Sequence, residues 1–205
     1  MDDYLKNLID RMQMEDKLQS SLSVSWQAFR EAELISNGDL IQDLIEYIDS
    51  VKDKNRRNSA YYILGKIAKN SLSEEILVYL ISRVNVESDK RILKTICELL
   101  SDLNKPTSID IGPILNALED KRWQVRQAAI LALKKTSNKD VEKKLIQILR
   151  ESKENIELLF TCVVLNEIGT NQSIEYLENL TKSRNQDIKT TSREAIESIK
   201  KRINS

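Results

Sequence analysis

Few residues in this chain have the types and spacing that catalysis or metal binding requires. The 205 residues include no histidine, so the commonest general base and the commonest metal ligand are missing. The two cysteines, Cys97 and Cys162, do not form a Cys-x-x-Cys pair. The four glycines are isolated from one another, so the sequence contains no phosphate-binding loop or dinucleotide fingerprint. These features predict a non-catalytic chain without a cofactor or a metal site.

Basic residues offer a second kind of chemistry, because they cluster in the first half of the chain. The cluster comprises Lys52, Lys54, Arg56, Arg57, Lys90, Arg91 and Lys94. Such a basic edge is one signature of nucleic-acid binding. The chain as a whole has 32 basic and 32 acidic residues, which argues against a strong overall field for nucleic acid or an anionic membrane. Asp53, Glu87 and Asp89 interrupt the cluster, so a solvated rim is the alternative interpretation.

The elements that must position these residues follow one helical pattern, which occurs five times. Each copy centres on an apolar anchor, and successive anchors lie 31 to 36 residues apart: Leu64, Leu100, Leu133, Leu165 and Ile196. Small or apolar residues four and one positions before each anchor give the period of an amphipathic helix. A shorter apolar motif precedes each copy. Two helices per repeat of this length predict an α-solenoid, in which each helical pair buries its apolar face against its neighbours.

One copy, residues 120–135, carries a recognisable family pattern. Its Asp120, Val125-Arg126, Ala129 and Leu133 resemble the HEAT repeat, close to the short bacterial HEAT-like form. The resemblance extends from about Leu40 to the C-terminus. It implies an all-α, right-handed α-solenoid (an α-α superhelix) whose second helices line a concave surface, and a generic scaffold function. It also implies an aspartate-to-arginine ladder between repeats, which Arg57 and Lys189 would extend and which leucines interrupt at Leu93 and Leu158.

We expect a single domain over residues 1–205, made of a cap and about five repeats. The N-terminal helical cap covers 1–38, and the repeats cover 39–70, 71–109, 110–137, 138–170 and 171–205. The cap is predicted to hold a helix over residues 2–15 and a second from Leu18 to Ile35, with Trp26, Phe29 and Leu34 turned inward. The longest break between repeats is the loop 104–108, which is interpreted either as a hinge or as an insertion at an edge.

A candidate binding face follows from the helical wheel of each second helix. Positions nine, six and two before the anchor point away from the core, and in the third and fourth repeats four of these six positions are apolar: Leu131, Ile156, Leu159 and Val163. A contiguous outward apolar patch is typical of a contact surface. We therefore predict a protein-binding concave face that comprises Tyr62, Glu98, Trp123, Gln127, Leu131, Ile156, Leu159 and Val163. The alternative is that tight curvature buries these residues under neighbouring helices.

Trp123 and Arg126 support a rival function. W-x-x-R at the start of a HEAT-like helix is similar to a fragment of the alkylpurine DNA glycosylases built on this repeat. That resemblance implies an aromatic and an arginine beside a flipped nucleotide in a basic groove. The second tryptophan, Trp26, is followed by no aspartate in its helix, and the chain is neutral overall. Nucleic-acid binding, including this enzyme class, is therefore the alternative to protein binding.

The remaining expectations concern partners and location. No apolar run approaches the ~20 residues of a membrane span, and the N-terminus lacks a signal-peptide core, so we expect a cytoplasmic protein without a membrane partner. Cys97 and Cys162 each lie three residues before an anchor, in repeats two apart, and are predicted to be buried free thiols of a reducing compartment. The protein is expected to be a monomer or a weak homo-oligomer.

Overall fold

The computed structural model describes residues 1–15 and 22–204, and over these ranges it contains helices and no strand. The prediction of an all-α repeat fold is therefore confirmed. The residues group into two compact units, Met1–Leu103 and Asn104–Ser205, which we call unit 1 and unit 2 and describe separately. The repeat boundaries and the single domain expected from the sequence stay predictions. None of the helices in the described ranges is both long and apolar enough to cross a membrane.

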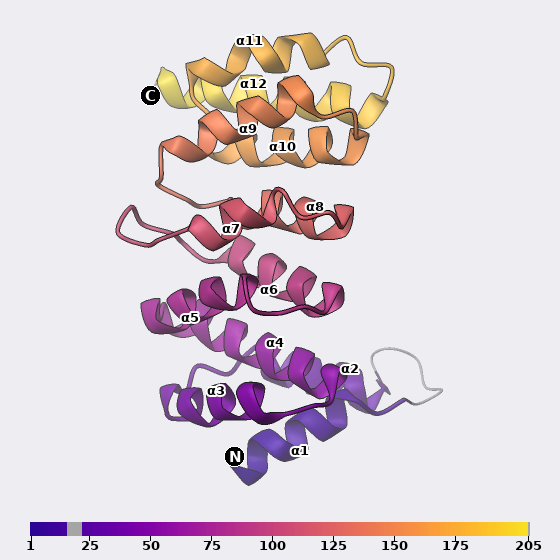
Figure 1. Ribbon diagram of the computed structural model, residues 1–205, viewed down its shortest axis with the longest axis vertical. Coiled ribbons are helices and arrows are strands. Elements are labelled where there is room, and N and C mark those ends of the chain that lie inside the picture. Colours follow the sequence, from indigo (N-terminus) through magenta and orange to yellow (C-terminus); the bar gives the residue numbers. More distant parts are fainter. Residues whose placement is uncertain (16–21, 205) are drawn as a thin grey trace. The chain divides into compact units, whose positions relative to one another are not determined.

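Unit 1 is built around its longest helix, α4 (Figure 1). The helix α4 contacts each of the other α-helices of the unit. The helices of unit 1 are α1 (Asp3–Met12), α2 (Val24–Ala32), α3 (Ile41–Ser50), α4 (Lys54–Ser71), α5 (Glu74–Val84) and α6 (Lys90–Asp102), with a 3-10 turn at Gly38–Leu40.

Short polar side chains begin the helices of unit 1. Asp53 accepts a hydrogen bond from the Arg56 backbone N–H at 2.9 Å and so caps α4, as its position in the sequence predicts. Asp89 caps α6 through the N–H groups of Arg91 and Ile92. Burial opposes ionisation of Asp89, but hydrogen bonds from Lys54 and from these N–H groups outweigh it and lower the pKa of the carboxyl group.

The N-terminal cap follows the prediction in α1 and departs from it in α2. Leu5, Leu8, Ile9 and Met12 are buried along one stripe of α1. The part of the predicted second helix over residues 18–21 lies outside the described residues. Trp26 and Leu34 are exposed rather than turned inward, and Phe29 is half-buried. The buried residues of α2 are instead the small ones, Ala28 and Ala32, one turn apart, which let the helix pack closely while its large side chains stay at the surface.

Unit 2 consists of three helical pairs (Figure 1). Its helices are α7 (Gly112–Ala117), α8 (Trp123–Ala132), α9 (Asp140–Glu151), α10 (Asn155–Ile168), α11 (Asn171–Leu180) and α12 (Gln186–Ile203). The second helix of each pair contacts the next, so that α10 lies between α8 and α12, while α9 packs against α11. Pro113 occupies the first turn of α7, where its missing N–H leaves no helical bond unmade.

The predicted anchors form the core of each unit. Leu64 and Leu100 are fully buried in unit 1, as are Leu133 and Leu165 in unit 2, and Ile196 is 8% exposed. All residues four positions before the anchors are also fully buried, including Thr161 and Ser192. The 3.6-residue period therefore identified the buried side of each second helix correctly.

The loop 104–108 is fixed to unit 2 by backbone hydrogen bonds. The Lys105 N–H donates to the Lys135 carbonyl at 2.8 Å, and the Ser137 N–H donates to the Lys105 carbonyl at 2.9 Å. These bonds create a short parallel bridge between Lys105 and Thr136, and the Lys105 side chain is fully buried. The loop is thus an ordered part of unit 2.

Candidate protein-binding face

The second helices of unit 2 lie in register, so that equivalent positions are neighbours. Arg126, seven residues before its anchor on α8, donates from Nε to Glu157 Oε1 at 2.7 Å, and Glu157 lies eight residues before the anchor of α10. Between α10 and α12, Arg202 Nη2 donates to the Gly169 carbonyl at 2.8 Å. A Cβ built on Gly169 would lie 2.9 Å from Ile199 Cδ1, so the two helices approach closely at matching levels.

The arginine of the predicted ladder binds a glutamate rather than an aspartate. Arg126 Nη1 donates to the Asp120 backbone carbonyl at 2.8 Å, but the Asp120 carboxylate binds Arg122 instead. In unit 1, Arg57 repeats the arrangement: Nη1 donates to the Val51 carbonyl at 3.1 Å and Nε lies 3.0 Å from Glu87 Oε2.

The predicted ladder is therefore wrong about the acidic residue that pairs with the arginine. The sequence separation between the arginine and a later glutamate is the signal that would have identified this partner. A glutamate follows Arg57 by 30 residues and Arg126 by 31. Asp120 and Asp187 lie near the starts of α8 and α12 but are not the N-cap residues of these helices. Asp120 receives the Arg122 guanidinium, and α12 is capped by Asn185 rather than by Asp187.

Each of the second helices α8, α10 and α12 carries three outward side chains that are four residues apart. The register of the helices places these nine side chains on one side of unit 2, and we call them the grid face. They are Trp123, Gln127 and Leu131 on α8, Asn155, Leu159 and Val163 on α10, and Gln186, Thr190 and Glu194 on α12. None of the nine is buried. The face is thus at least partly open to solvent.

Part of the grid face is apolar. Leu131, Leu159 and Val163 of this face and the adjacent Ile156, which together we call the apolar patch, are all half-buried. Helix α10 carries apolar residues on every side, a pattern that is usual for a helix covered all round. In unit 2, α10 packs against α8, α9 and α12. The apolar side chains Ile156, Leu159 and Val163 nevertheless remain partly exposed.

The two predicted site residues in unit 1 have partners within that unit. The Tyr62 hydroxyl donates to Glu33 at 2.9 Å, and its ring meets the Phe29 ring edge-on at 5.0 Å between centroids. Burial and the Glu33 carboxylate raise the pKa of Tyr62. Glu98 is exposed and lies 3.4 Å from Lys94. The other six predicted residues are together on α8 and α10.

Charge on the grid face is acidic and lies on α12. Glu194 is exposed, and its helical neighbours three and four positions away are Thr190, Thr191, Glu197 and Ser198, none of which is basic. The nine residues include no lysine or arginine. The face therefore changes from aromatic and apolar on α8 and α10 to polar and acidic on α12.

Most of the predicted basic edge of unit 1 is matched by carboxylates. Lys54 lies 3.1 Å from Asp89, Arg56 contacts Asp10, and Arg57 contacts Glu87. Arg91 and Lys94 lie within 4 Å of Asp89 and Glu98. Local neutralisation of this kind weakens the attraction for phosphates that the nucleic-acid alternative needs.

Trp123 and Arg126, the two residues that resemble the DNA glycosylases, have different surroundings in the structure. Trp123 is 49% exposed at the first turn of α8. Arg126 is engaged by Glu157 and by the Asp120 carbonyl, so its guanidinium serves the contact between helical pairs.

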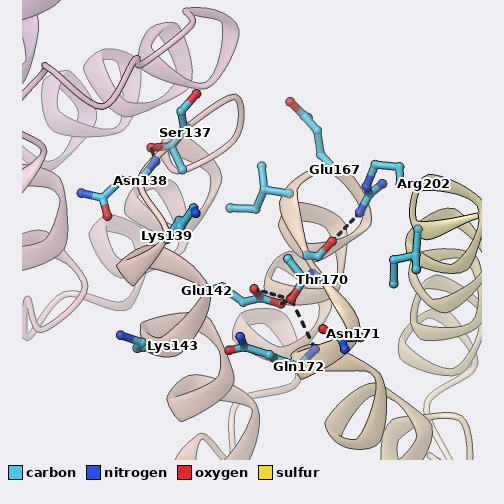
Figure 2. A pocket seen from close by; sticks show the side chains of 14 residues that line it. Ser137, Asn138, Lys139, Glu142, Lys143, Glu167, Thr170, Asn171, Gln172 and Arg202 are labelled. Atoms are coloured by element: carbon cyan, nitrogen blue, oxygen red, sulfur yellow. Dashed lines mark hydrogen bonds between the residues drawn. The ribbon is translucent and has the colours of Figure 1, made fainter. Parts of the chain in front are cut away.

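A cleft of about 870 Å³ opens at the edge of unit 2 (Figure 2). It lies among the loop after α8, the start of α9, the turn from α10 to α11 and the end of α12. Its buried carboxylate, Glu142, accepts hydrogen bonds from the Thr170 N–H at 2.7 Å and from the Ser173 hydroxyl at 2.5 Å. Figure 2 shows Glu142 pointing at Thr170, and it shows Arg202 of α12 reaching a carbonyl at the end of α10, where Nη2 donates to Gly169. These groups cap helix ends, so their hydrogen-bonding capacity serves the fold.

The two thiols are in the core and are free, as predicted. Burial raises the pKa of Cys97 and of Cys162 to about 12, so both are protonated at neutral pH. Among the described residues, no group of three or more histidine, cysteine or acidic side chains is placed to hold a metal ion.

Comparison with solved structures places the fold among α-helical repeat proteins. A designed armadillo repeat protein in complex with the peptide (KR)4 matches at a TM-score of 0.58 and 16% identity, covering 95% of this chain and 99% of that one. An engineered protein from a structural-genomics consortium matches at 0.57 and 18%, covering 98% and 100%. Computationally designed armadillo repeat proteins for modular peptide recognition match at 0.53 and 15%, covering 95% and 99%.

The sequence comparison then gives the particular repeat. Residues 111–197 match the family model of HEAT repeats, so this segment of the chain is similar to HEAT repeats. The matched segment lies wholly in unit 2, the unit that carries the grid face. No match was found among curated proteins.

Proposed function

We propose that this protein is a non-catalytic interaction module that binds a polypeptide segment on the grid face of unit 2. The observation that carries the proposal is the outward side of α10. Its apolar side chains Ile156, Leu159 and Val163 stay half-buried beside Leu131 of α8, where solvent-facing positions ordinarily hold polar residues. A partner that covers them would remove this apolar area from water.

Two further observations support a polypeptide as the partner. The segment that bears the patch is the one that matches HEAT repeats, and the fold is shared with designed repeat proteins, one of which was solved with the peptide (KR)4. Buried free thiols in both units suit a reducing compartment, which favours the cytoplasm as the site of action.

The test is selection of binders from a display library of random peptides on the purified protein. The selected peptides are then measured against the double variant Leu131→Asp and Val163→Asp, whose charges would lie in the interface. The proposal predicts selected peptides that bind the wild type and lose most of their affinity for this variant. Val78→Asp, an exposed apolar position on α5 of unit 1, is the matched control and should leave binding unchanged.

Circular dichroism separates the outcomes. If the double variant keeps the helical signal and the thermal midpoint of the wild type but loses the peptide, the patch is an interaction surface. If it unfolds, the single variant Leu131→Gln replaces it. Peptides that bind both proteins equally, or a selection that yields no peptide, would contradict the proposal.

A further inference from the structure

We infer that the polypeptide bound by the grid face presents two apolar residues followed or preceded by a basic residue, spaced two or three positions apart. This inference rests on the proposed function and names the chemistry of the segment that the face recognises. It comes from the order of residues across the three helices and from the spacing of those helices.

Residues at the C-terminal end of the grid face form a row across unit 2. Leu131 on α8, Val163 on α10 and Glu194 on α12 each lie two positions before their anchors. The Arg126–Glu157 ion pair and the Arg202–Gly169 hydrogen bond hold the helices in register, so these side chains are neighbours across the row. A chain that crosses the helices meets an apolar, an apolar and an acidic residue in succession.

The spacing of the helices sets the spacing in the partner. Packed helices lie ~8–10 Å apart, and an extended chain advances ~3.3–3.6 Å per residue. One helix-to-helix step therefore corresponds to about two or three residues of an extended peptide. The middle row, which comprises Gln127, Leu159 and Thr190, supplies one more apolar contact and two polar groups for the peptide backbone.

The charge of the partner follows from Glu194. The carboxylate is exposed and has no basic residue one turn before or after it on α12. Asp187 adds a second exposed acid on the same helix, and the grid face has no base to repel a cation. An acidic flank beside an apolar centre complements a segment that carries lysine or arginine next to its apolar residues.

The experiment uses the peptides selected on the full chain and compares Glu194→Lys with Glu197→Lys. Glu197 is an exposed acid on α12 outside the grid face, so the two variants have the same net charge. We expect Glu194→Lys to weaken the binding of the selected peptides about tenfold, because an ion pair is lost and two like charges are brought together. Glu197→Lys should change this binding less than about twofold. A peptide whose basic residue is replaced by glutamate should prefer Glu194→Lys over the wild type.

The outcomes distinguish this inference from the proposed function. Selected peptides without a basic residue, or with equal affinity for both variants, would overturn the inference even where they still depend on Leu131 and Val163. Peptides that ignore the apolar patch would overturn the proposed function itself. Added salt should weaken the wild-type complex and leave the complex with Glu194→Gln less affected.

Discussion

Arg126 of α8 reaches across to Glu157 of α10, with 2.7 Å between Nε and Oε1. The same guanidinium holds the Asp120 carbonyl at 2.8 Å, and the Ser152 hydroxyl donates to the other oxygen of Glu157 at 2.7 Å. Glu157 is buried and Arg126 is half-buried, and both make further hydrogen bonds. The pair fixes the register that the grid face requires.

Replacing Glu157 with glutamine should destabilise unit 2 while leaving it folded. The neutral amide still accepts one hydrogen bond but leaves the Arg126 charge without its counter-ion, at a cost of about 1–2 kcal/mol. The measurement is the urea midpoint of unfolding. Glu154→Gln removes an exposed acid three residues earlier. It should shift the urea midpoint less than about a quarter as far as Glu157→Gln does. Equal shifts for the two variants would show that the pair contributes nothing specific.

Gly65 lies at a close approach of α4 to α6. A Cβ at this position would lie 2.6 Å from Leu99 Cδ1 and Cδ2. Alanine gains about 1 kcal/mol of helix propensity, whereas overpacking costs about 1–3 kcal/mol. We therefore expect Gly65→Ala to lower the stability of unit 1 in urea unfolding.

A double-mutant cycle checks the cause. Leu99→Ala should cost less in the Gly65→Ala background than in the wild type, because the shorter side chain relieves the contact. Gly38→Ala is the control, since its nearest neighbour, Ile41 Cδ1, is 3.8 Å from the added Cβ. Additive effects of the two changes would refute the steric explanation.

Leu72 ends α4 in the left-handed conformation, with φ of 55°. This backbone region costs a non-glycine residue about 1–2 kcal/mol, and the Leu72 side chain is 79% exposed, so little packing compensates. Leu72→Gly should raise the thermal midpoint of unfolding. Val78→Gly, in the interior of α5, should lower it, because glycine loses more conformational entropy there. A lower midpoint for Leu72→Gly would mean that the leucine makes stabilising contacts that its exposure hides.

The ion pair between Asp120 and Arg122 should make the stability of the fold depend on pH. The Arg122 guanidinium, hydrogen-bonded to the carboxylate, lowers the pKa of Asp120 below its ordinary value. The stabilisation is therefore complete above about pH 4 and is lost as the pH falls through the lowered pKa.

Thermal midpoints of the wild type and of Asp120→Asn test this pH dependence. The wild type should be more stable at about pH 7, and the difference should shrink on acidification toward about pH 3. Glu119→Gln, at an acid 4.0 Å from Lys144, is the control for a general change in net charge. A difference that stays constant with pH would contradict the assignment.

The periodicity of the sequence predicts which residues form the core, but it does not predict which residues make contact between helical pairs. The anchors Leu64, Leu100, Leu133, Leu165 and Ile196 are buried because the 3.6-residue period decides which side of a helix faces its neighbours. Tyr61 is buried and Tyr62 lies at the rim for the same reason. The partner of Arg126 depends on which residue of the next helix lies at the same level, and this register is a tertiary property.

The same limit applies to the cap and to the candidate site. Trp26 and Leu34 were expected inside because large apolar residues usually are, but α2 packs through Ala28 and Ala32. The patch residues lie on the second helices α8 and α10, and their role in binding stays a prediction. Their partial exposure depends on how closely α8, α10 and α12 follow one another, and no single helix encodes that distance.

The central claim concerns the apolar patch, and methyl NMR tests it most directly. Spectra of the protein with labelled isoleucine, leucine and valine methyl groups are recorded as a selected peptide is added. We predict that the signals of Leu131, Ile156, Leu159 and Val163 shift together while that of Ile67, buried in unit 1, does not. Saturable shifts confined to other methyl groups, with the four patch signals unmoved, would contradict the account.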